Sequence, residues 1–85
     1  MADEEILKML TDAMASIDYD ETLKACKEAM SRGVPPAKVV GALSEAMRVI
    51  GERFEAKEYF LSELIMAGEI MKEAQGILKP HFKAG

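Results

Sequence analysis

The sequence predicts an all-α fold, an antiparallel four-helix bundle. Apolar residues recur at steps of three and four along four segments, which is the spacing of amphipathic helices. No segment shows the apolar–polar alternation of a strand. The expected connections are short, roughly two to six residues, and short connections join antiparallel neighbours. With 85 residues the chain is one small domain, and we expect the bundle over residues 1–80.

The first two helices are expected from about Asp3 to Ser16 and from Asp18 to Gly33. Acidic residues at positions 3–5 suit the positive end of the first helix dipole. Asp18 can cap the second helix, with Glu21 three positions later in a capping-box pattern. The predicted core stripes are Ile6, Leu10, Ala13, Met14 and Ile17 in the first helix, and Tyr19, Leu23, Cys26 and Met30 in the second. Cys26 is therefore predicted to be a buried structural residue and not a nucleophile.

The third helix is expected to open at Pro35 and Pro36, where the missing N–H of proline costs little. It should end between Ala56 and Tyr59. The fourth should start near Leu61 or Ser62 and stop at Pro80, which leaves residues 81–85 as a tail. The predicted stripes are Val39 or Val40, Leu43, Met47, Ile50 and Phe54 in the third helix, and Leu64, Ile65, Gly68, Met71, Ala74 and Leu78 in the fourth.

Four glycines fall inside the third and fourth predicted helices: Gly41, Gly51, Gly68 and Gly76. Each costs roughly 1 kcal/mol relative to alanine in a helix interior. The favoured explanation is close approach of one helix to another. For Gly51 and Gly68 a functional alternative is that a wide, flat molecule comes near the backbone.

Composition argues against several classes of function. A net charge of −4 with interspersed signs disfavours nucleic-acid binding. An acidic N-terminus is unlike a signal peptide, and no apolar run approaches the ~20 residues of a membrane span. The lone Cys26 excludes an intrachain disulfide, so we expect a cytoplasmic protein. With one histidine, His81, the chain lacks the ligands of zinc or di-iron sites, and we expect no enzyme activity from it alone.

Three blocks resemble a known family: Ile50-Gly51-Glu52-Arg53-Phe54, Glu58-Tyr59-Phe60-Leu61-Ser62-Glu63-Leu64 and Met71-Lys72. They are similar to the helical cap domain of cobalamin-dependent methyltransferase corrinoid proteins and to the matching module of cobalamin-dependent methionine synthase. The opening helices resemble that domain too, so the likeness covers nearly the whole chain. The Phe-Leu-x-Glu-Leu stretch is its most specific part.

The resemblance implies that Phe54 and Leu61 shield the methyl–cobalt bond of a cobalamin cofactor, with Leu64 and Ile65 completing the apolar lid. Two residues depart from the family pattern. Lys57 replaces a usual glycine, which would alter the turn if a positive φ is needed there. Ser62 replaces a usual proline but is still expected to start the fourth helix well.

The same resemblance implies partners. After Pro80 the family continues into an α/β cobalamin-binding domain with an Asp-x-His-x-x-Gly motif, whose histidine ligates cobalt from below. Nothing in this chain replaces that motif, so we expect cobalamin to bind only together with such a domain, and a corrinoid methyltransferase to be a further partner. The chain is then an excised cap module or a stand-alone relative.

Three other interpretations stay open. The four lid residues could instead close the end of the core. An uncovered lid could drive a homodimer through Phe54, Tyr59, Phe60 and Leu61. Acyl carrier proteins are also small, acidic and four-helical, but they need serine in an Asp-Ser-Leu context, whereas Ser62 lies between leucine and glutamate.

Overall fold

The computed structural model describes residues 3–82 and confirms the all-α four-helix bundle. Its helices are α1 (Asp3–Ala15), α2 (Tyr19–Ser31), α3 (Pro36–Glu55) and α4 (Leu61–Leu78), followed by the short 3₁₀ turn η1 (Lys79–His81). The expected helix boundaries agree within one or two residues. The predicted tail differs at its start, because the chain continues helically through Pro80 to His81.

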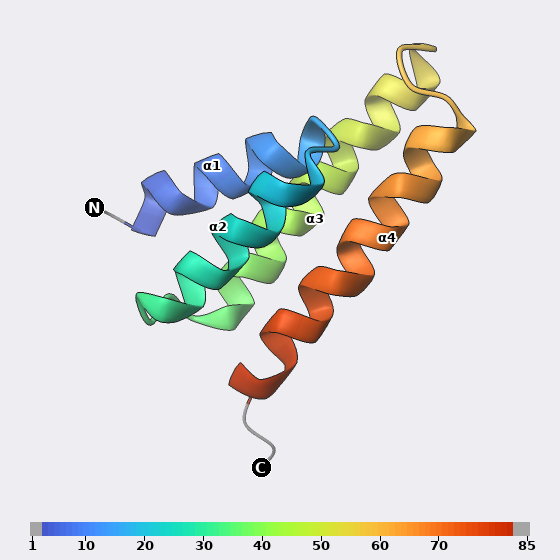
Figure 1. Ribbon diagram of the computed structural model, residues 1–85. Coiled ribbons are helices and arrows are strands. Elements are labelled where there is room, and N and C mark those ends of the chain that lie inside the picture. Colours follow the sequence, from blue (N-terminus) through green and yellow to red (C-terminus); the bar gives the residue numbers. More distant parts are fainter. Residues whose placement is uncertain (1–2, 83–85) are drawn as a thin grey trace.

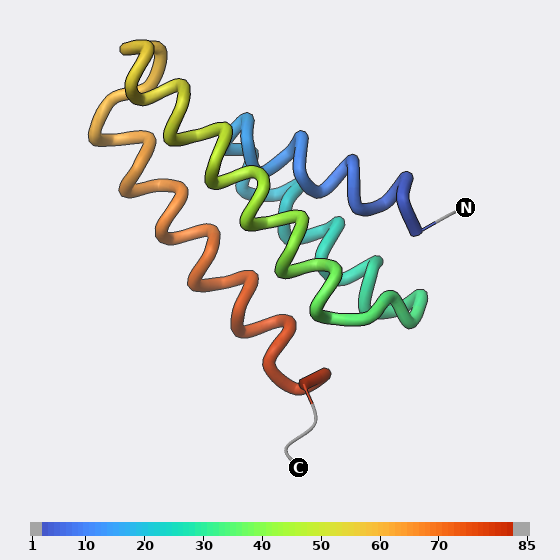
Figure 2. Tube along the Cα trace, turned by 180° about the vertical axis from the view of Figure 1, so that it is seen from behind, coloured from blue at the N-terminus to red at the C-terminus, as the bar shows by residue number. Residues whose placement is uncertain are grey.

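The helices form two antiparallel pairs of unequal length (Figure 1). α1 packs mainly on α2 and α3, α2 also packs on α4, and contact between α3 and α4 is sparser. Seen from both sides, the connected end of α3 and α4 projects past α1 and α2 (Figure 2). One end of the α3–α4 pair therefore has no neighbouring helix to cover it.

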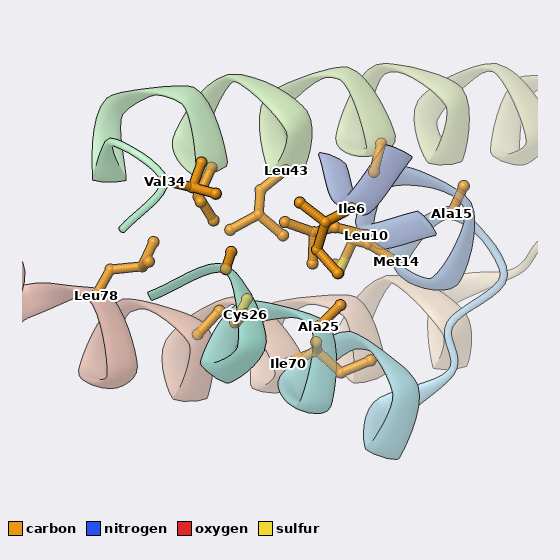
Figure 3. Packing of buried hydrophobic residues seen from close by; sticks show 14 of the residues in the cluster. Ile6, Leu10, Met14, Ala15, Ala25, Cys26, Val34, Leu43, Ile70 and Leu78 are labelled. Atoms are coloured by element: carbon orange, nitrogen blue, oxygen red, sulfur yellow. The ribbon is translucent and has the colours of Figure 1, made fainter. Parts of the chain in front are cut away.

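The core runs along the interior between the helices and is almost entirely apolar (Figure 3). Alanines at positions 29, 46, 67 and 74 are fully buried among larger side chains, which lets the helices pack closely there. The large fully buried side chains are Ile6, Leu10, Met14, Val39, Leu43, Ile50, Ile70 and Leu78. Cys26 is also fully buried, and burial raises the pKa of its thiol to about 11. This agrees with its predicted structural role.

The predicted inward face of α4 is partly wrong. Ile65 and Gly68, which belong to the predicted stripe, are exposed. Ala67 and Ile70, outside the predicted stripe, are buried. α4 carries apolar residues on most of its circumference, so spacing alone could not select the face that packs inward. Tyr19 and Phe54 were also placed on core stripes but are exposed, because they lie in the terminal turns of α2 and α3.

The expectation that the four helical glycines mark close helix approach is wrong. All four are exposed, and a Cβ built on any of them would meet no atom within 4 Å. The flat-ligand explanation for Gly51 and Gly68 stays a prediction.

Three helices end in the same Schellman motif, in which the residue after the cap adopts a left-handed backbone. These residues are Ile17 (φ 56°), Gly33 (φ 79°) and Lys57 (φ 65°). After α3, for example, the Lys57 N–H donates to the Phe54 carbonyl (3.0 Å) and the Glu58 N–H to the Arg53 carbonyl (2.8 Å). The turn does require a positive φ, and Lys57 adopts it without changing the motif.

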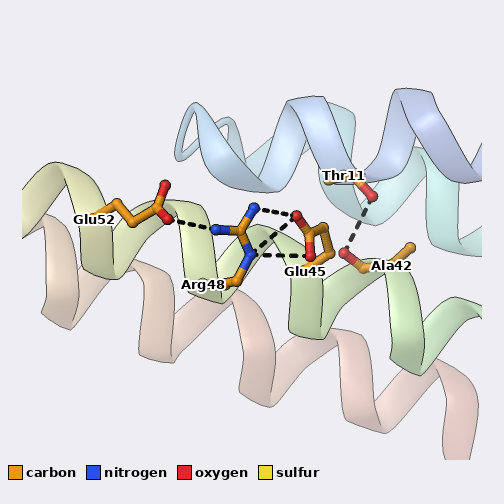
Figure 4. Close-up of polar contacts among 5 residues, drawn as sticks. All are labelled: Thr11, Ala42, Glu45, Arg48 and Glu52. Atoms are coloured by element: carbon orange, nitrogen blue, oxygen red, sulfur yellow. Dashed lines mark hydrogen bonds and ion pairs between the residues drawn. The ribbon is translucent and has the colours of Figure 1, made fainter.

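Polar contacts between helices are few and specific. The Thr11 hydroxyl of α1 lies 3.1 Å from the Ala42 carbonyl of α3 (Figure 4). It also lies 3.0 Å from the Leu7 carbonyl of its own helix. Along the exposed side of α3, Arg48 pairs with Glu45 and Glu52. Such exposed pairs contribute little to stability. Across residues 3–82, no helix is both long and apolar enough to cross a bilayer.

Candidate functional site

The projecting end of α3 and α4 carries a group of exposed apolar side chains, which we call the apolar tip: Phe54, Phe60, Leu61 and Ile65. Their exposed fractions are 42%, 63%, 66% and 59%. Phe54 lies in the last turn of α3, and Leu61 opens α4 after the connection of residues 56–60. Side chains this exposed do not close the end of the core in this chain.

The sequence-predicted site residues divide into two kinds. Leu61 and Ile65 are four residues apart and share one face of α4. Phe54 reaches the same end from α3. Leu64 differs, because it is half-buried and packs against the core. Leu64 therefore lies between the apolar tip and the core, and less of its side chain is exposed to solvent. All four side chains are hydrocarbon and offer no atom that could ligate a metal.

The start of α4 is held by a carboxylate and not by a serine cap. Phe60 is the residue before the helix, in an extended backbone conformation (φ −118°, ψ −172°). Its N–H donates to Glu63 Oε1 at 2.7 Å. This backbone hydrogen bond holds the pKa of Glu63 below its ordinary value. The expectation that the fourth helix starts near Leu61 or Ser62 is confirmed, with Phe60 in the cap position and Ser62 within the first turn. The Glu63 carboxylate therefore holds the backbone of Phe60 at the start of α4.

A polar junction that the sequence did not reveal fastens the connection to α1. The Tyr59 hydroxyl donates to the Ala15 carbonyl (2.7 Å), and Arg53 Nη1 donates to the same carbonyl (3.0 Å) and to Tyr59 Oη (2.9 Å). The Arg53 guanidinium also lies over the tyrosine ring, 5.5 Å from its centroid. These residues are up to 44 positions apart in the chain, so no local spacing could indicate their contact.

The junction changes one expectation about Tyr59. It was expected in an exposed self-association surface, but it is half-buried and packs on the core, and its hydroxyl is used within the chain. Phe54, Phe60 and Leu61 are the exposed members of that surface.

Away from the apolar tip, two features bear on possible ligand sites. Within residues 3–82, no group of three or more histidine, cysteine or acidic side chains could hold a metal ion. His81 is exposed at the end of the bundle opposite the tip. An open hollow of about 270 Å³ lies at that end, lined by Val40, Gln75, Leu78, Lys79 and Phe82.

Comparison with known proteins gives a consistent result. A sequence profile described as the B12 binding domain matches residues 6–79. The monomethylamine corrinoid protein 1 of Methanosarcina barkeri is 37% identical over 84 residues, which is 98% of this chain and 39% of that protein. The trimethylamine corrinoid protein 1 of Methanosarcina acetivorans is 27% identical over 81 residues, 94% of this chain and 38% of that protein.

A solved structure supports the same relationship. The Methanosarcina barkeri monomethylamine corrinoid protein superposes with a TM-score of 0.86 at 37% sequence identity. The match covers 94% of this chain and 38% of the other. The chain thus spans about two fifths of the length of the relatives it matches.

Proposed function

Because this chain belongs to the B12 binding domain family, we propose that it is the helical cap module of a corrinoid methyl-carrier protein and shields the upper face of methylcobalamin during methyl transfer. It acts as an accessory module. Methylcobalamin, when bound, supplies the transferable methyl group, and a partner methyltransferase supplies the catalytic groups.

The observation that carries this proposal is the exposure of Phe54, Leu61 and Ile65 at an end that no helix of the described chain covers. Hydrocarbon side chains exclude water without competing for cobalt. Their contacts are dispersive and individually weak, so such a cap can leave when a methyl acceptor arrives. Exposed Gly51 and Gly68 lie one turn from Phe54 and Ile65, and their open surroundings suit a flat ring passing close to the backbone.

The residues present fit the upper face of the cofactor only. Histidine ligation from below would come from an α/β cobalamin-binding domain, as the family resemblance implies. We therefore place that domain and a corrinoid methyltransferase as the partners of this chain, with residues 1–80 as the cap and residues 81–85 leading toward the cobalamin-binding domain.

A titration tests the proposal. The chain is added to methylcobalamin bound to the isolated α/β domain of a related corrinoid protein, and affinity is followed by the cobalamin absorbance spectrum. We expect saturable binding and slower loss of the methyl group under light in air. Leu61→Asp should weaken binding at least ten-fold. Met9→Asp is the matched control and should bind normally, because Met9 is an apolar side chain on α1 that is also half exposed (50%, against 66% for Leu61).

Two results would contradict the cap function. One is the absence of any spectral change or affinity with the loaded domain. The other is equal behaviour of Leu61→Asp and Met9→Asp, because binding would then not use the apolar tip.

A second candidate is a stand-alone homodimer, which the exposure of Phe60 and Leu61 favours. In this case two copies would cover each other's tips. Light scattering decides it: the wild type would be a dimer and Leu61→Asp a monomer, whereas monomers in both samples remove this function.

A further inference from the structure

The Arg53–Tyr59 junction lies between the apolar tip and the body of the bundle. Of the connection between α3 and α4, residues 56–58 and Phe60 are exposed, and only Tyr59 is half-buried. Its ring packs on the core, and its hydroxyl reaches the end of α1. Tyr59 is thus the residue through which the connection touches the other half of the molecule.

The acceptor at this junction is well suited to its two donors. Ala15 ends α1, and the carbonyls of a last helical turn lack partners within the helix. No basic residue occupies the last turn of α1. Arg53 brings a positive charge from α3 to this negative helix end, and charge-assisted hydrogen bonds are the stronger kind. The Tyr59 N–H also donates to the Arg53 carbonyl at 3.1 Å, so the two residues are joined through both their backbones and their side chains.

The two residues flank the residues proposed to cap the cofactor. Arg53 precedes Phe54 and Tyr59 precedes Phe60 and Leu61 in the chain. Because α3 and α4 have sparse contact with each other, their projecting end needs another constraint to hold one orientation. The junction supplies that constraint.

We propose that Arg53 and Tyr59 are positioning residues that form a latch between the α3–α4 connection and α1, and thereby fix the orientation of the apolar tip. With the latch closed, Phe54 and Leu61 are presented in a single arrangement. With it open, the end of the pair moves while the core stays folded. The link from tip orientation to cofactor capping rests on the function proposed above.

Amide hydrogen exchange on the full 85-residue chain tests the latch without any cofactor. Tyr59→Phe keeps the ring and removes only the hydroxyl. We expect exchange of the hydrogen-bonded amides of residues 58–60 to accelerate about five-fold, the change in the local opening equilibrium that corresponds to the loss of one ordinary hydrogen bond. Arg53→Met should act in the same way. Thr11→Val is the matched control: it removes the other α1–α3 hydrogen bond, far from the tip, and should leave exchange at residues 58–60 unchanged.

The results separate the latch from general stability. Unchanged exchange at residues 58–60 in Tyr59→Phe, or acceleration there by Thr11→Val as well, would overturn the latch. In the titration with the methylcobalamin-loaded domain, the affinity of Tyr59→Phe should fall by the factor by which the closed fraction of the latch falls, and Thr11→Val should bind normally. Normal binding by a double variant with Tyr59→Phe and Arg53→Met, in which the latch is mostly open, would overturn the positioning role. If the wild type does not bind at all, the cap function fails, and hydrogen exchange still decides whether the latch exists.

Discussion

Replacing Lys57 with glycine should stabilise this protein. Lys57 has a left-handed backbone (φ 65°) after α3, which costs a residue with a Cβ about 1–2 kcal/mol. Its side chain is exposed and makes no ion pair with any residue of the described range 3–82. Removing the side chain therefore relieves the backbone without losing a contact.

Two smaller effects oppose the gain. Glycine increases the conformational entropy of the unfolded chain, which offsets about 0.4–1 kcal/mol. The lysine charge also interacts favourably with the negative C-terminal end of α3, and glycine loses this interaction, which salt screens. In high salt we expect a net gain of about 0.5–1 kcal/mol, which raises the Tm of a domain of this size by roughly 3–6 °C.

The assay is thermal unfolding followed by far-UV circular dichroism in high salt. Ala56→Gly is the matched control, because Ala56 is adjacent and exposed but has a right-handed backbone (φ −78°, ψ 0°). It should lower the free energy of unfolding by about 0.5–1 kcal/mol. A lower Tm for Lys57→Gly, or the same change in both variants, would refute the argument from backbone strain.

Three further predictions concern burial and titration. Because burial raises the pKa of Cys26, the stability that its neutral thiol contributes is complete below pH 9.0 and declines by about 1.4 kcal/mol per pH unit as the pH rises toward 11. In urea unfolding at each pH, Cys26→Ala should lack this decline. The depressed pKa of Glu63 means that its hydrogen bond to the start of α4 is present at neutral pH and lost in acid as the carboxylate is protonated. Protection of the Phe60 amide relative to its intrinsic exchange rate should therefore fall in acid in the wild type, whereas in Glu63→Ala it should be low at both pH values. Leu10→Ala should lower the free energy of unfolding by about 2–5 kcal/mol and Leu61→Ala by less than about 0.5 kcal/mol, because Leu10 is 0% exposed and Leu61 is 66% exposed. Similar losses for the two variants in chemical unfolding would contradict the assigned core.

Local signals in the sequence were sufficient for the helices themselves. Asp18 does cap α2, with its side chain accepting from the Glu21 N–H at 3.1 Å, and proline opens α3 as predicted. Each of these features depends on neighbours within one helical turn. The sequence therefore predicted the number, order and approximate bounds of the helices.

The remainder depended on contacts between distant segments. The rotation of α4 is set by what packs on Ala67 and Ile70, and an all-round apolar helix does not encode that choice in its spacing. Arg53 and Tyr59 meet the end of α1 across 38 and 44 positions. The tip residues were predicted from a family resemblance, and the structure adds that Leu64 is half-buried, unlike Phe54, Leu61 and Ile65.

The open space beside the helical glycines has a practical consequence for engineering. Gly41 and Gly76 lie in the half of the α3–α4 pair away from the tip, and a methyl group at either would touch nothing. Alanine at both positions would add about 2 kcal/mol, a sizeable share of the roughly 4–13 kcal/mol expected for a domain of this length. A variant stabilised in this way would stay folded with destabilising substitutions at the apolar tip, so the tip could be redesigned more freely.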